Sequence, residues 1–244
     1  MTTAMLYPII TTEAATQALS ILHRSGVSTI THPAPEITHL LLDVPSFIQE
    51  GRFRDGSYVE DILERIPPNI TVIGGNLDHP TFAYCKKLDL LKDETYLAKN
   101  AAITADCALR IAAPHLKTTF SDTPTLILGW GRIGKCLAQM LNAIGPPVTV
   151  AARNSADRAM LTALGYNAVD YEQLPKDCSL VFNTVPGQHF PEFPNCVQID
   201  LASEQSLSGP SVIWARGLPG TIAPETSGKL IAKTILRYLK EESS

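Results

Sequence analysis

The sequence predicts an α/β protein with two parallel-sheet domains, and three observations carry this prediction. Short apolar runs recur along the chain, and several end in small or turn-forming residues before a helical pattern begins, as strands of parallel sheets do. One such run, 125–128, leads directly into the spacing Gly-x-Gly-x-x-Gly at 129–134. This motif begins so late in a chain of 244 residues that we expect a separate domain before it.

The first hundred residues predict the smaller domain, a flavodoxin-like α/β unit. We expect a helix over 13–23 and strands at 6–10, 27–30, 40–44 and 70–73. Ligands of parallel α/β sheets bind at the carboxyl ends of the strands. Ser46, Gly74 and Gly75 follow strands of this domain and are candidate substrate-binding residues, with ordinary turn chemistry as the alternative.

A short strand at 96–98 and an alanine-rich helix over 100–113 are expected next. Thr104 and Asp106 lie on this helix and are candidate catalytic residues. Asp106 and Arg110 also stand four residues apart, so a surface ion pair is an equally supported interpretation. The segment after the helix is rich in Thr, Ser and Pro and is typical of a domain joint.

The glycine motif has the surroundings that a dinucleotide-binding turn requires. An apolar strand precedes it, an amphipathic helix capped by Gly145 follows it, and a second strand is expected at 148–151. The first glycine allows the tight turn, the second lets a pyrophosphate approach the backbone, and the third lets the helix pack closely. The sequence therefore predicts a Rossmann-type doubly wound parallel sheet, although glycines that serve packing alone are the alternative. The candidate cofactor-binding residues of the turn are Gly129, Trp130, Gly131, Arg132, Ile133 and Gly134.

The end of the second strand indicates which dinucleotide is bound. NAD-binding turns usually carry an acidic residue about 20 residues after the first glycine, where this chain has Ala152. The residues beyond it offer guanidinium and hydroxyl groups to a 2′-phosphate, namely Arg153, Asn154, Ser155 and Arg158. This pattern favours NADP over NAD, and a solvated basic face at a helix start is the other interpretation.

Three further strands are expected to deliver residues to the same edge of the sheet. They end near 182, 200 and 215, and the nicotinamide of a dinucleotide usually lies beside the first of them. The candidate cofactor-binding residues are Asn183, Thr184, Val185, Pro186, Asp200 and Ser203, and Arg216 follows the last strand as a candidate catalytic residue. Turn formers dominate 216–228 before a final amphipathic helix, as in backbone that approaches a ligand or in a stiff loop.

The predicted organisation has four parts. They are an N-terminal α/β substrate-side domain over 1–98, a connecting helix and joint over 99–123, a Rossmann dinucleotide-binding domain over 124–223, and a C-terminal helix over 224–244.

Composition excludes several classes of protein. A net charge of −4 and a pI near 5.9, without a cluster of lysine and arginine, argue against nucleic-acid or membrane partners. The five cysteines are widely spaced and form no CxxC pair, which fits reduced thiols and suggests no metal site. Because neither a signal peptide nor a membrane span is predicted, we expect a soluble, cytoplasmic protein. A homo-oligomer is compatible with these features.

Several motifs together resemble the dipicolinate synthase A family. They lie at 129–134, 152–155, 183–186, 200–203, 217–220 and 223–228, and the last two are the most distinctive. The resemblance runs well from about 99 to 239 and more loosely through 40–98. It points to Gly217 and Pro219 as cofactor-binding residues and to Thr226 as a substrate-binding residue. Thr104 and Asp106 fall where the family carries a threonine and an acidic residue.

The resemblance implies a two-domain protein related in architecture to 2-hydroxyacid dehydrogenases. The implied reaction is the NADP- or NAD-dependent oxidation of a dihydrodipicolinate-type dicarboxylate, or its hydrated precursor, to dipicolinate in spore formation. The implied partner is the flavoprotein-like second subunit of dipicolinate synthase. Such a reaction mainly requires that two planar molecules are oriented and that one proton is accepted.

The chain departs from the family pattern at two charged positions. Glu204 stands where the family has an arginine, and Arg216 replaces a proline. Because a dicarboxylate needs a cation, we hypothesise that Arg216 binds a substrate carboxylate in bidentate fashion, with a surface salt bridge as the alternative. His189, the only histidine after Gly134, fits a structural loop better than a general base. The alternative functions are a non-catalytic dinucleotide-binding subunit or scaffold, and a 2-hydroxyacid-type reductase.

Overall fold

The computed structural model describes residues 4–49 and 51–242. The chain divides into two units, which we name after their sheets. The five-stranded unit comprises Met1–Asn100 and Pro219–Ser244, and the six-stranded unit comprises Ala101–Leu218. Within the described ranges, no helix combines the length and apolar character that a bilayer crossing requires.

The sheet of the five-stranded unit is parallel throughout, with the strand order β2-β1-β3-β4-β5. Its strands are β1 (Met5–Ile9), β2 (Ser28–Thr29), β3 (His39–Leu42), β4 (Thr71–Gly74) and β5 (Lys86–Asp89). All four residues of β3 are buried, because this strand lies in the middle of the sheet. The order 2-1-3-4-5 is the flavodoxin-like order, so the predicted class of the smaller domain is confirmed.

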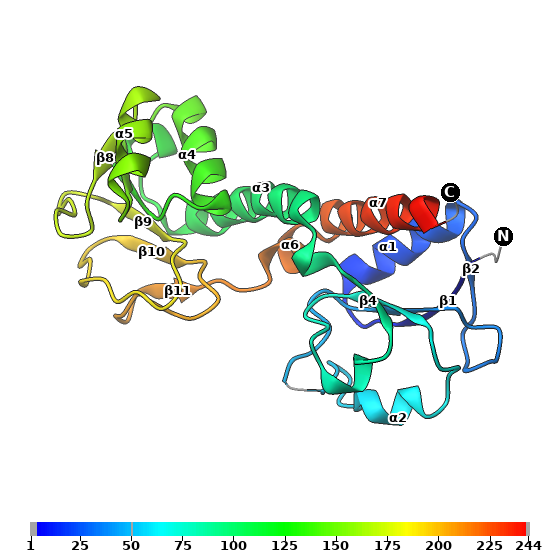
Figure 1. The fold of residues 1–244 in the computed structure, drawn as a ribbon. Helices are drawn as coiled ribbons and strands as arrows, with labels where there is room; N and C mark the ends of the chain where they lie inside the picture. The colour runs from blue at the N-terminus through cyan, green and yellow to red at the C-terminus, as the bar shows by residue number, and fades with distance from the viewer. Residues whose placement is uncertain (1–3, 50, 243–244) are drawn as a thin grey trace. The chain divides into compact units, whose positions relative to one another are not determined.

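Two long helices of this unit pack against each other. They are α1 (Glu13–Arg24) and α7 (Pro224–Glu242), drawn in blue and red in Figure 1. A Cβ on Gly228 would lie 2.6 Å from the carbonyl oxygen of Ala14 and 2.6 Å from the Cβ of Gln17. The absence of a side chain at Gly228 therefore allows the two helix backbones to approach closely.

The sheet of the six-stranded unit is also parallel throughout, with the order β11-β10-β9-β6-β7-β8. Its strands are β6 (Thr125–Leu128), β7 (Val148–Ala151), β8 (Asn167–Val169), β9 (Leu180–Asn183), β10 (Val197–Asp200) and β11 (Val212–Trp214). Helices α4 (Arg132–Ile144) and α5 (Ser155–Ala163) connect the first three strands of this sheet. Counted within the unit, the order is 6-5-4-1-2-3, which confirms the predicted Rossmann-type sheet.

The strand expected at 96–98 is wrong, because these residues lie in the first turns of α3 (Glu94–Ala112). Asp93 begins this helix. Its Oδ1 accepts the N–H of Tyr96 at 2.7 Å, and its carbonyl oxygen accepts the N–H of Leu97 at 2.9 Å. A side-chain cap of this kind fixes the start of a helix, and here it starts the helix six residues earlier than the alanine-rich run suggests.

Several short elements were not expected from the sequence. The strands β5 and β8 lie at sheet edges and carry polar residues instead of an apolar run. The helices α2 (Val59–Leu63) and α6 (Leu218–Ile222) have five residues each, and α6 lies inside the segment expected to be turns. Short 3₁₀ turns are η1 (Pro80–Phe82), η2 (Leu90–Lys92), η3 (Ala113–His115) and η4 (Phe120–Asp122).

Candidate dinucleotide site

The carboxyl ends of the strands in the six-stranded unit form one continuous row. The strand register pairs Trp214 with Asp200, Asp200 with Asn183, Asn183 with Leu128, and Leu128 with Ala151. Between β6 and β9 the direction in which the chain adds strands reverses. Open α/β sheets bind ligands outside the carboxyl ends of their strands at such a switch point. The residues that directly follow this row therefore form the candidate site.

The three glycines of the turn have different surroundings. Gly129 has φ +102°, and a Cβ there would lie 2.5 Å from the Oγ1 of Thr184. A Cβ on Gly134 would lie 2.2 Å from the carbonyl oxygen of Gly129. A Cβ on Gly131, by contrast, would meet no described atom within 4 Å apart from its chain neighbours. The turn is thus tight at its first and third glycines and open at its second, as a turn that receives a pyrophosphate must be.

Helix α4 begins at this turn, with Gly131 as its N-cap. A glycine N-cap has no side chain with which to satisfy the first N–H groups of the helix. Arg132 is exposed and Ile133 is half-buried. The N–H groups and the dipole at the start of a helix favour an anion, so the turn fits the phosphates of a dinucleotide.

Trp130 lies between the first two glycines and is half-buried. Its ring is 5.8 Å from the ring of Tyr166, and the Nζ of Lys135 lies 5.7 Å from its centroid. These contacts hold the indole beside the start of α4 and place a positive charge near it.

The turn after β9 is bound directly to the glycine turn. Thr184 donates both its N–H, at 2.9 Å, and its hydroxyl, at 2.8 Å, to the carbonyl oxygen of Leu128. The Oδ1 of Asn183 accepts the N–H of Val185 at 3.0 Å, and Pro186 is exposed. The structure therefore brings 183–186 together with 129–134 at the switch point.

Asp200 is fully buried, and four donors bind its carboxylate. Its Oδ1 accepts the side-chain amide of Asn183 at 2.8 Å and the N–H of Ala202 at 3.0 Å. Its Oδ2 accepts the N–H groups of Ser206 at 2.7 Å and Leu207 at 2.8 Å. Asp200 thus organises the loop after β10, and both carboxylate oxygens are already occupied by hydrogen bonds from the protein.

The loop that Asp200 holds contains residues that sequence reasoning missed. The Ser206 hydroxyl donates to the carbonyl oxygen of Val185 at 2.9 Å, which ties this loop to the turn after β9. Ser203 and Glu204 are exposed on the same loop. The sequence signal was the buried aspartate at a strand end, but its partners six and seven residues later follow no recognisable motif.

The end of β7 presents the residues predicted to contact a 2′-phosphate. Ala152 is buried, whereas Arg153, Asn154 and Ser155 are exposed. The Asn154 side chain caps α5 by accepting the N–H of Ala156 at 2.8 Å. Within the described part of the chain, the Arg153 guanidinium makes no hydrogen bond or ion pair. Its charge is therefore available to an anion beside this strand end.

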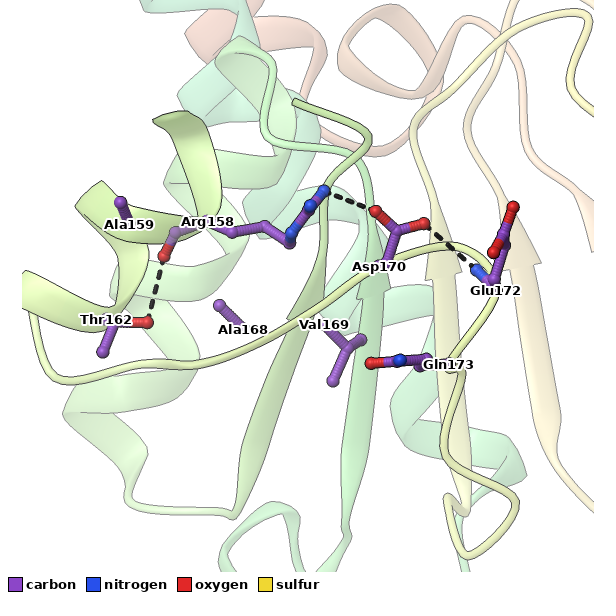
Figure 2. A pocket seen from close by; sticks show the side chains of 8 residues that line it. All are labelled: Arg158, Ala159, Thr162, Ala168, Val169, Asp170, Glu172 and Gln173. Atoms are coloured by element: carbon purple, nitrogen blue, oxygen red, sulfur yellow. Dashed lines mark hydrogen bonds and ion pairs between the residues drawn. The ribbon is translucent and has the colours of Figure 1, made fainter. Parts of the chain in front are cut away.

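Arg158 is held differently from Arg153. Its Nη1 donates to the carbonyl oxygens of Ala152 and Arg153, both at 2.7 Å, and lies 2.6 Å from the Oδ2 of Asp170. Figure 2 shows the side chain reaching from α5 to Asp170, which follows β8. Arg158 thus fixes the β7–α5 turn and the end of β8.

A hollow of about 440 Å³ lies beside this ion pair. Eight described residues line it, all of them from α5, β8 and the segment after β8: Arg158, Ala159, Thr162, Ala168, Val169, Asp170, Glu172 and Gln173. None of these residues belongs to the glycine turn or to the turn after β9. The register and the glycine geometry, and not this hollow, define the candidate site.

Arg216 follows β11 and is exposed. Its guanidinium lies over the ring of Trp214, with 5.4 Å between the guanidinium carbon and the ring centroid. Gly217 has φ +65°, and Pro219 lies in the first turn of α6. Trp214 had not been singled out from the sequence, because nothing in the sequence shows that the two side chains stack.

The two candidates on α3 have different environments. Thr104 is buried, with 8% of its surface exposed. The Oδ2 of Asp106 lies 2.8 Å from the Nε of Arg110, in a solvent-exposed ion pair. The ion pair that the sequence offered as the alternative interpretation for Asp106 is therefore present.

In the five-stranded unit, three of the predicted substrate residues meet at the carboxyl ends of β3 and β4. The Ser46 hydroxyl donates to the carbonyl oxygen of Asp43 at 2.9 Å and accepts the N–H of Gly75 at 3.0 Å. A Cβ on Gly74 would lie 2.3 Å from this hydroxyl oxygen. Ser46, Gly74 and Gly75 thus form one packed turn, while Thr226 lies exposed in the first turn of α7.

Asp43 is a buried carboxylate that sequence reasoning missed. Its Oδ2 accepts the N–H and hydroxyl of Thr11 at 3.0 and 2.8 Å, and its Oδ1 accepts those of Thr12 at 3.0 and 2.5 Å. Thr11 and Thr12 follow β1 and Asp43 follows β3, the two strands at the switch point of this sheet. The bonds join two loops that lie more than thirty residues apart in sequence.

Comparisons with known proteins agree with this geometry. Residues 100–190 match the family model of the D-isomer specific 2-hydroxyacid dehydrogenase NAD-binding domain. The chain is 27% identical to dipicolinate synthase A of Bacillus subtilis over 237 residues, which covers 86% of this chain and 80% of that protein. The resemblance that the motifs predicted is thereby confirmed.

Two solved structures share the fold over nearly the whole chain. The dipicolinate synthase A of Bacillus halodurans has a TM-score of 0.84 at 20% identity, covering 98% of both chains. The dipicolinate synthase A chain of Bacillus subtilis has a TM-score of 0.82 at 22% identity, covering 99% of this chain and 97% of that chain.

Proposed function

We propose that this chain, similar in sequence and fold to dipicolinate synthase A, is a nicotinamide-dinucleotide-dependent oxidoreductase that converts a dihydropyridine dicarboxylate to the aromatic dicarboxylate. The matched NAD-binding domain model supports the cofactor class. The observation that carries the proposal is the turn at 129–134, which is closed to side chains at Gly129 and Gly134 and open at Gly131. A turn that served packing alone would not need the open second glycine.

The row of strand ends suggests how the dinucleotide is bound. Its pyrophosphate meets the N–H groups at the start of α4, its adenosine extends toward β7, and its nicotinamide extends toward β9 and β10. The bound nicotinamide supplies the hydride acceptor. Asn183, Thr184 and Val185 orient it, because their mutual hydrogen bonds fix the turn after β9.

The chemistry requires little acid–base assistance from the protein. The substrate loses a hydride to the cofactor and a proton to solvent, and the ring becomes aromatic, so orientation of two planar molecules is the main task. Asp106 is paired with Arg110, and His189 is exposed. This mechanism accordingly assigns the proton to no protein base.

NADP is the proposed cofactor in preference to NAD. Ala152 places no carboxylate at the end of β7 that would repel a 2′-phosphate, and the exposed Arg153 guanidinium is available to bind one. Burial raises the pKa of the nearby Tyr171 phenol and the Arg153 charge opposes that rise, which places the guanidinium near the end of β8 as well. Arg158, held by Asp170, supports this anion site by fixing the backbone of the turn.

Arg216 is the residue that we propose to bind a substrate carboxylate. It is an exposed arginine that makes no ion pair with any described carboxylate, and it follows β11 on the nicotinamide side of the sheet. In the five-stranded unit we propose that the turn of Ser46, Gly74 and Gly75 contributes shape, and that Thr226 contributes an exposed hydroxyl. Thr104 remains a proposed catalytic residue on α3.

A flavoprotein-like subunit is the proposed partner, because the related protein is named as one subunit of a synthase. The test mixes the protein with NADP and freshly generated dihydrodipicolinate, with and without a candidate partner of this kind, and follows the appearance of NADPH. We expect NADPH formation in at least one mixture and none when NADP is omitted.

Two results would contradict this function. Cofactor binding without turnover in either mixture would indicate a non-catalytic dinucleotide-binding subunit. Oxidation of NADPH with small 2-keto acids, without any reaction of the dihydropyridine, would indicate a 2-hydroxyacid-type reductase.

A further inference from the structure

Arg216 is held by an aromatic face and not by an opposite charge. Its guanidinium lies 5.4 Å from the centroid of the Trp214 ring, and both side chains are on the solvent side of β11 and the loop after it. Buried Ala215 stands between them and points the other way, as the period of two in extended backbone requires. Over the described residues, no carboxylate lies within ion-pair distance of Arg216.

The Trp214 ring is itself fixed from below. Its Nε1–H donates to the carbonyl oxygen of Ala202 at 3.1 Å. The N–H of Ala202 is bound to the buried carboxylate of Asp200 at 3.0 Å, and the N–H of Ala215 is bound to the Asp200 carbonyl oxygen at 2.8 Å. A continuous set of hydrogen bonds thus runs from the buried end of β10 to the ring on which the guanidinium lies.

Stacking has a different consequence from a salt bridge. A carboxylate partner would occupy the N–H groups of the guanidinium and neutralise its charge, whereas a ring face leaves the planar edge free for a bidentate anion. A stacked arginine also has fewer rotamers to lose when it binds. The environment of Arg216 therefore suits a preorganised receptor for a carboxylate.

The position of this pair on the sheet fits a substrate. β11 lies three strands from β6, so the pair is roughly 14 Å from the glycine turn at the usual strand spacing. Arg153 lies on the opposite side of the glycine turn, at the end of β7. A dinucleotide spread along the strand ends would have its adenosine near Arg153 and its reacting end toward Arg216.

We infer that Trp214 is a positioning residue, which holds the Arg216 guanidinium ready for one carboxylate of the dicarboxylate substrate. This inference rests on the proposed function for the class of substrate. It adds a residue that acts through Arg216 and that contacts neither the cofactor turn nor, in itself, the reacting atoms.

The test is a double-mutant cycle with Trp214→Leu, Arg216→Met and the double variant. Calorimetry measures the affinity of each for pyridine-2,6-dicarboxylate in the presence of saturating NADP, and for NADP alone. We expect Trp214→Leu to weaken dicarboxylate binding roughly threefold, as loss of an exposed cation–π contact does. We expect Arg216→Met to weaken it roughly tenfold or more, as loss of a charged hydrogen-bonding partner does.

The double variant is the decisive comparison. If Trp214 acts through Arg216, the double variant binds the dicarboxylate no more weakly than Arg216→Met alone. Trp214→Phe, which keeps a ring face and loses only the bond to Ala202, stays within about twofold of the wild type. NADP affinity is unchanged in all four variants.

Three outcomes would overturn the inference. Additive losses in the double variant would show that Trp214 acts independently of Arg216, and an unchanged affinity in Trp214→Leu would show that the stack has no role. Absence of dicarboxylate binding by the wild type would remove both this inference and the proposed substrate class. Binding that follows the predicted cycle, without turnover of the dihydropyridine, would refute the proposed reaction and leave the inference standing.

Discussion

At the scale of single residues, the three glycines of the turn separate two roles that a motif cannot distinguish. Gly129 and Gly134 lack room for a side chain because protein atoms occupy the space, so their role is structural. Gly131 has room for a side chain and a backbone conformation that alanine also adopts, with φ −77°. A glycine that the protein itself does not require there is explained by a ligand that does.

Gly131→Ala therefore should separate binding from stability. We expect the melting temperature to stay the same or rise slightly, since an unstrained Gly→Ala change stabilises a protein by up to about 1 kcal/mol. We expect dinucleotide binding, measured by calorimetry, to weaken by roughly tenfold or more, because the new methyl group stands where the pyrophosphate approaches. Gly134→Ala is the matched control and should lower both quantities, and an unchanged affinity in Gly131→Ala would contradict the assignment of this turn.

The two arginines beyond β7 should also behave differently. Arg153→Ala should weaken NADP binding roughly tenfold and leave NAD binding unchanged, because only the 2′-phosphate meets this guanidinium. Arg158→Ala removes the ion pair with Asp170 and two bonds to carbonyl oxygens, so it should lower the free energy of unfolding by about 1 kcal/mol. Equal losses for NADP and NAD in Arg153→Ala would remove the basis for the NADP preference.

At the scale of elements, buried carboxylates hold the loops at the strand ends. Asp200 gathers the loop after β10, and Asp43 ties the loop after β1 to the end of β3. In both cases backbone N–H groups are among the donors, so the carboxylate sets the path of the chain. Each sheet thus has a fixed edge at its switch point.

Asp200→Asn tests this role in the six-stranded unit. The amide turns one acceptor of the side chain into a donor that faces N–H groups, so we expect a loss of about 3 kcal/mol in the free energy of unfolding. Urea unfolding at neutral pH measures it. Glu204→Gln is the control, because this exposed carboxylate lies on the same loop and its replacement should change little. A stability loss no larger than that of the control would show that the four hydrogen bonds contribute nothing.

Gly228→Ala tests the packing of α1 against α7. The added methyl group would overlap the backbone of α1 at Ala14, so we expect a loss of about 2 kcal/mol in the free energy of unfolding. Lys229→Ala changes an exposed neighbour on the same helix and should be nearly neutral. Thermal unfolding of the two variants side by side decides the matter, and equal melting temperatures would contradict the close approach.

At the scale of the whole molecule, the two sheets could be predicted because their signals are local. The apolar runs at β3, β6, β9 and β10 and the glycine spacing at 129–134 are visible in the sequence, and parallel topology follows from them. The edge strands β5 and β8 were missed because an edge strand needs no apolar run. The strand at 96–98 was wrong because the cap by Asp93 has more influence than local β-propensity.

The candidate site was predictable in outline and not in its connections. The strand ends named the residues, but the partners of Asp200, the bonds from Asp43 to Thr11 and the stack of Arg216 on Trp214 depend on loops that meet only after folding. Pairing of this kind leaves no periodic signal in a single sequence.

The most direct test is titration of the folded wild-type chain with NADP and with NAD in a calorimeter. Dinucleotide bound at the start of α4 should give saturable heat with a single site per chain and an affinity for NADP roughly tenfold above that for NAD. Protein that is folded by circular dichroism and yet takes up neither nucleotide would contradict the assignment of the turn at 129–134 and everything built upon it.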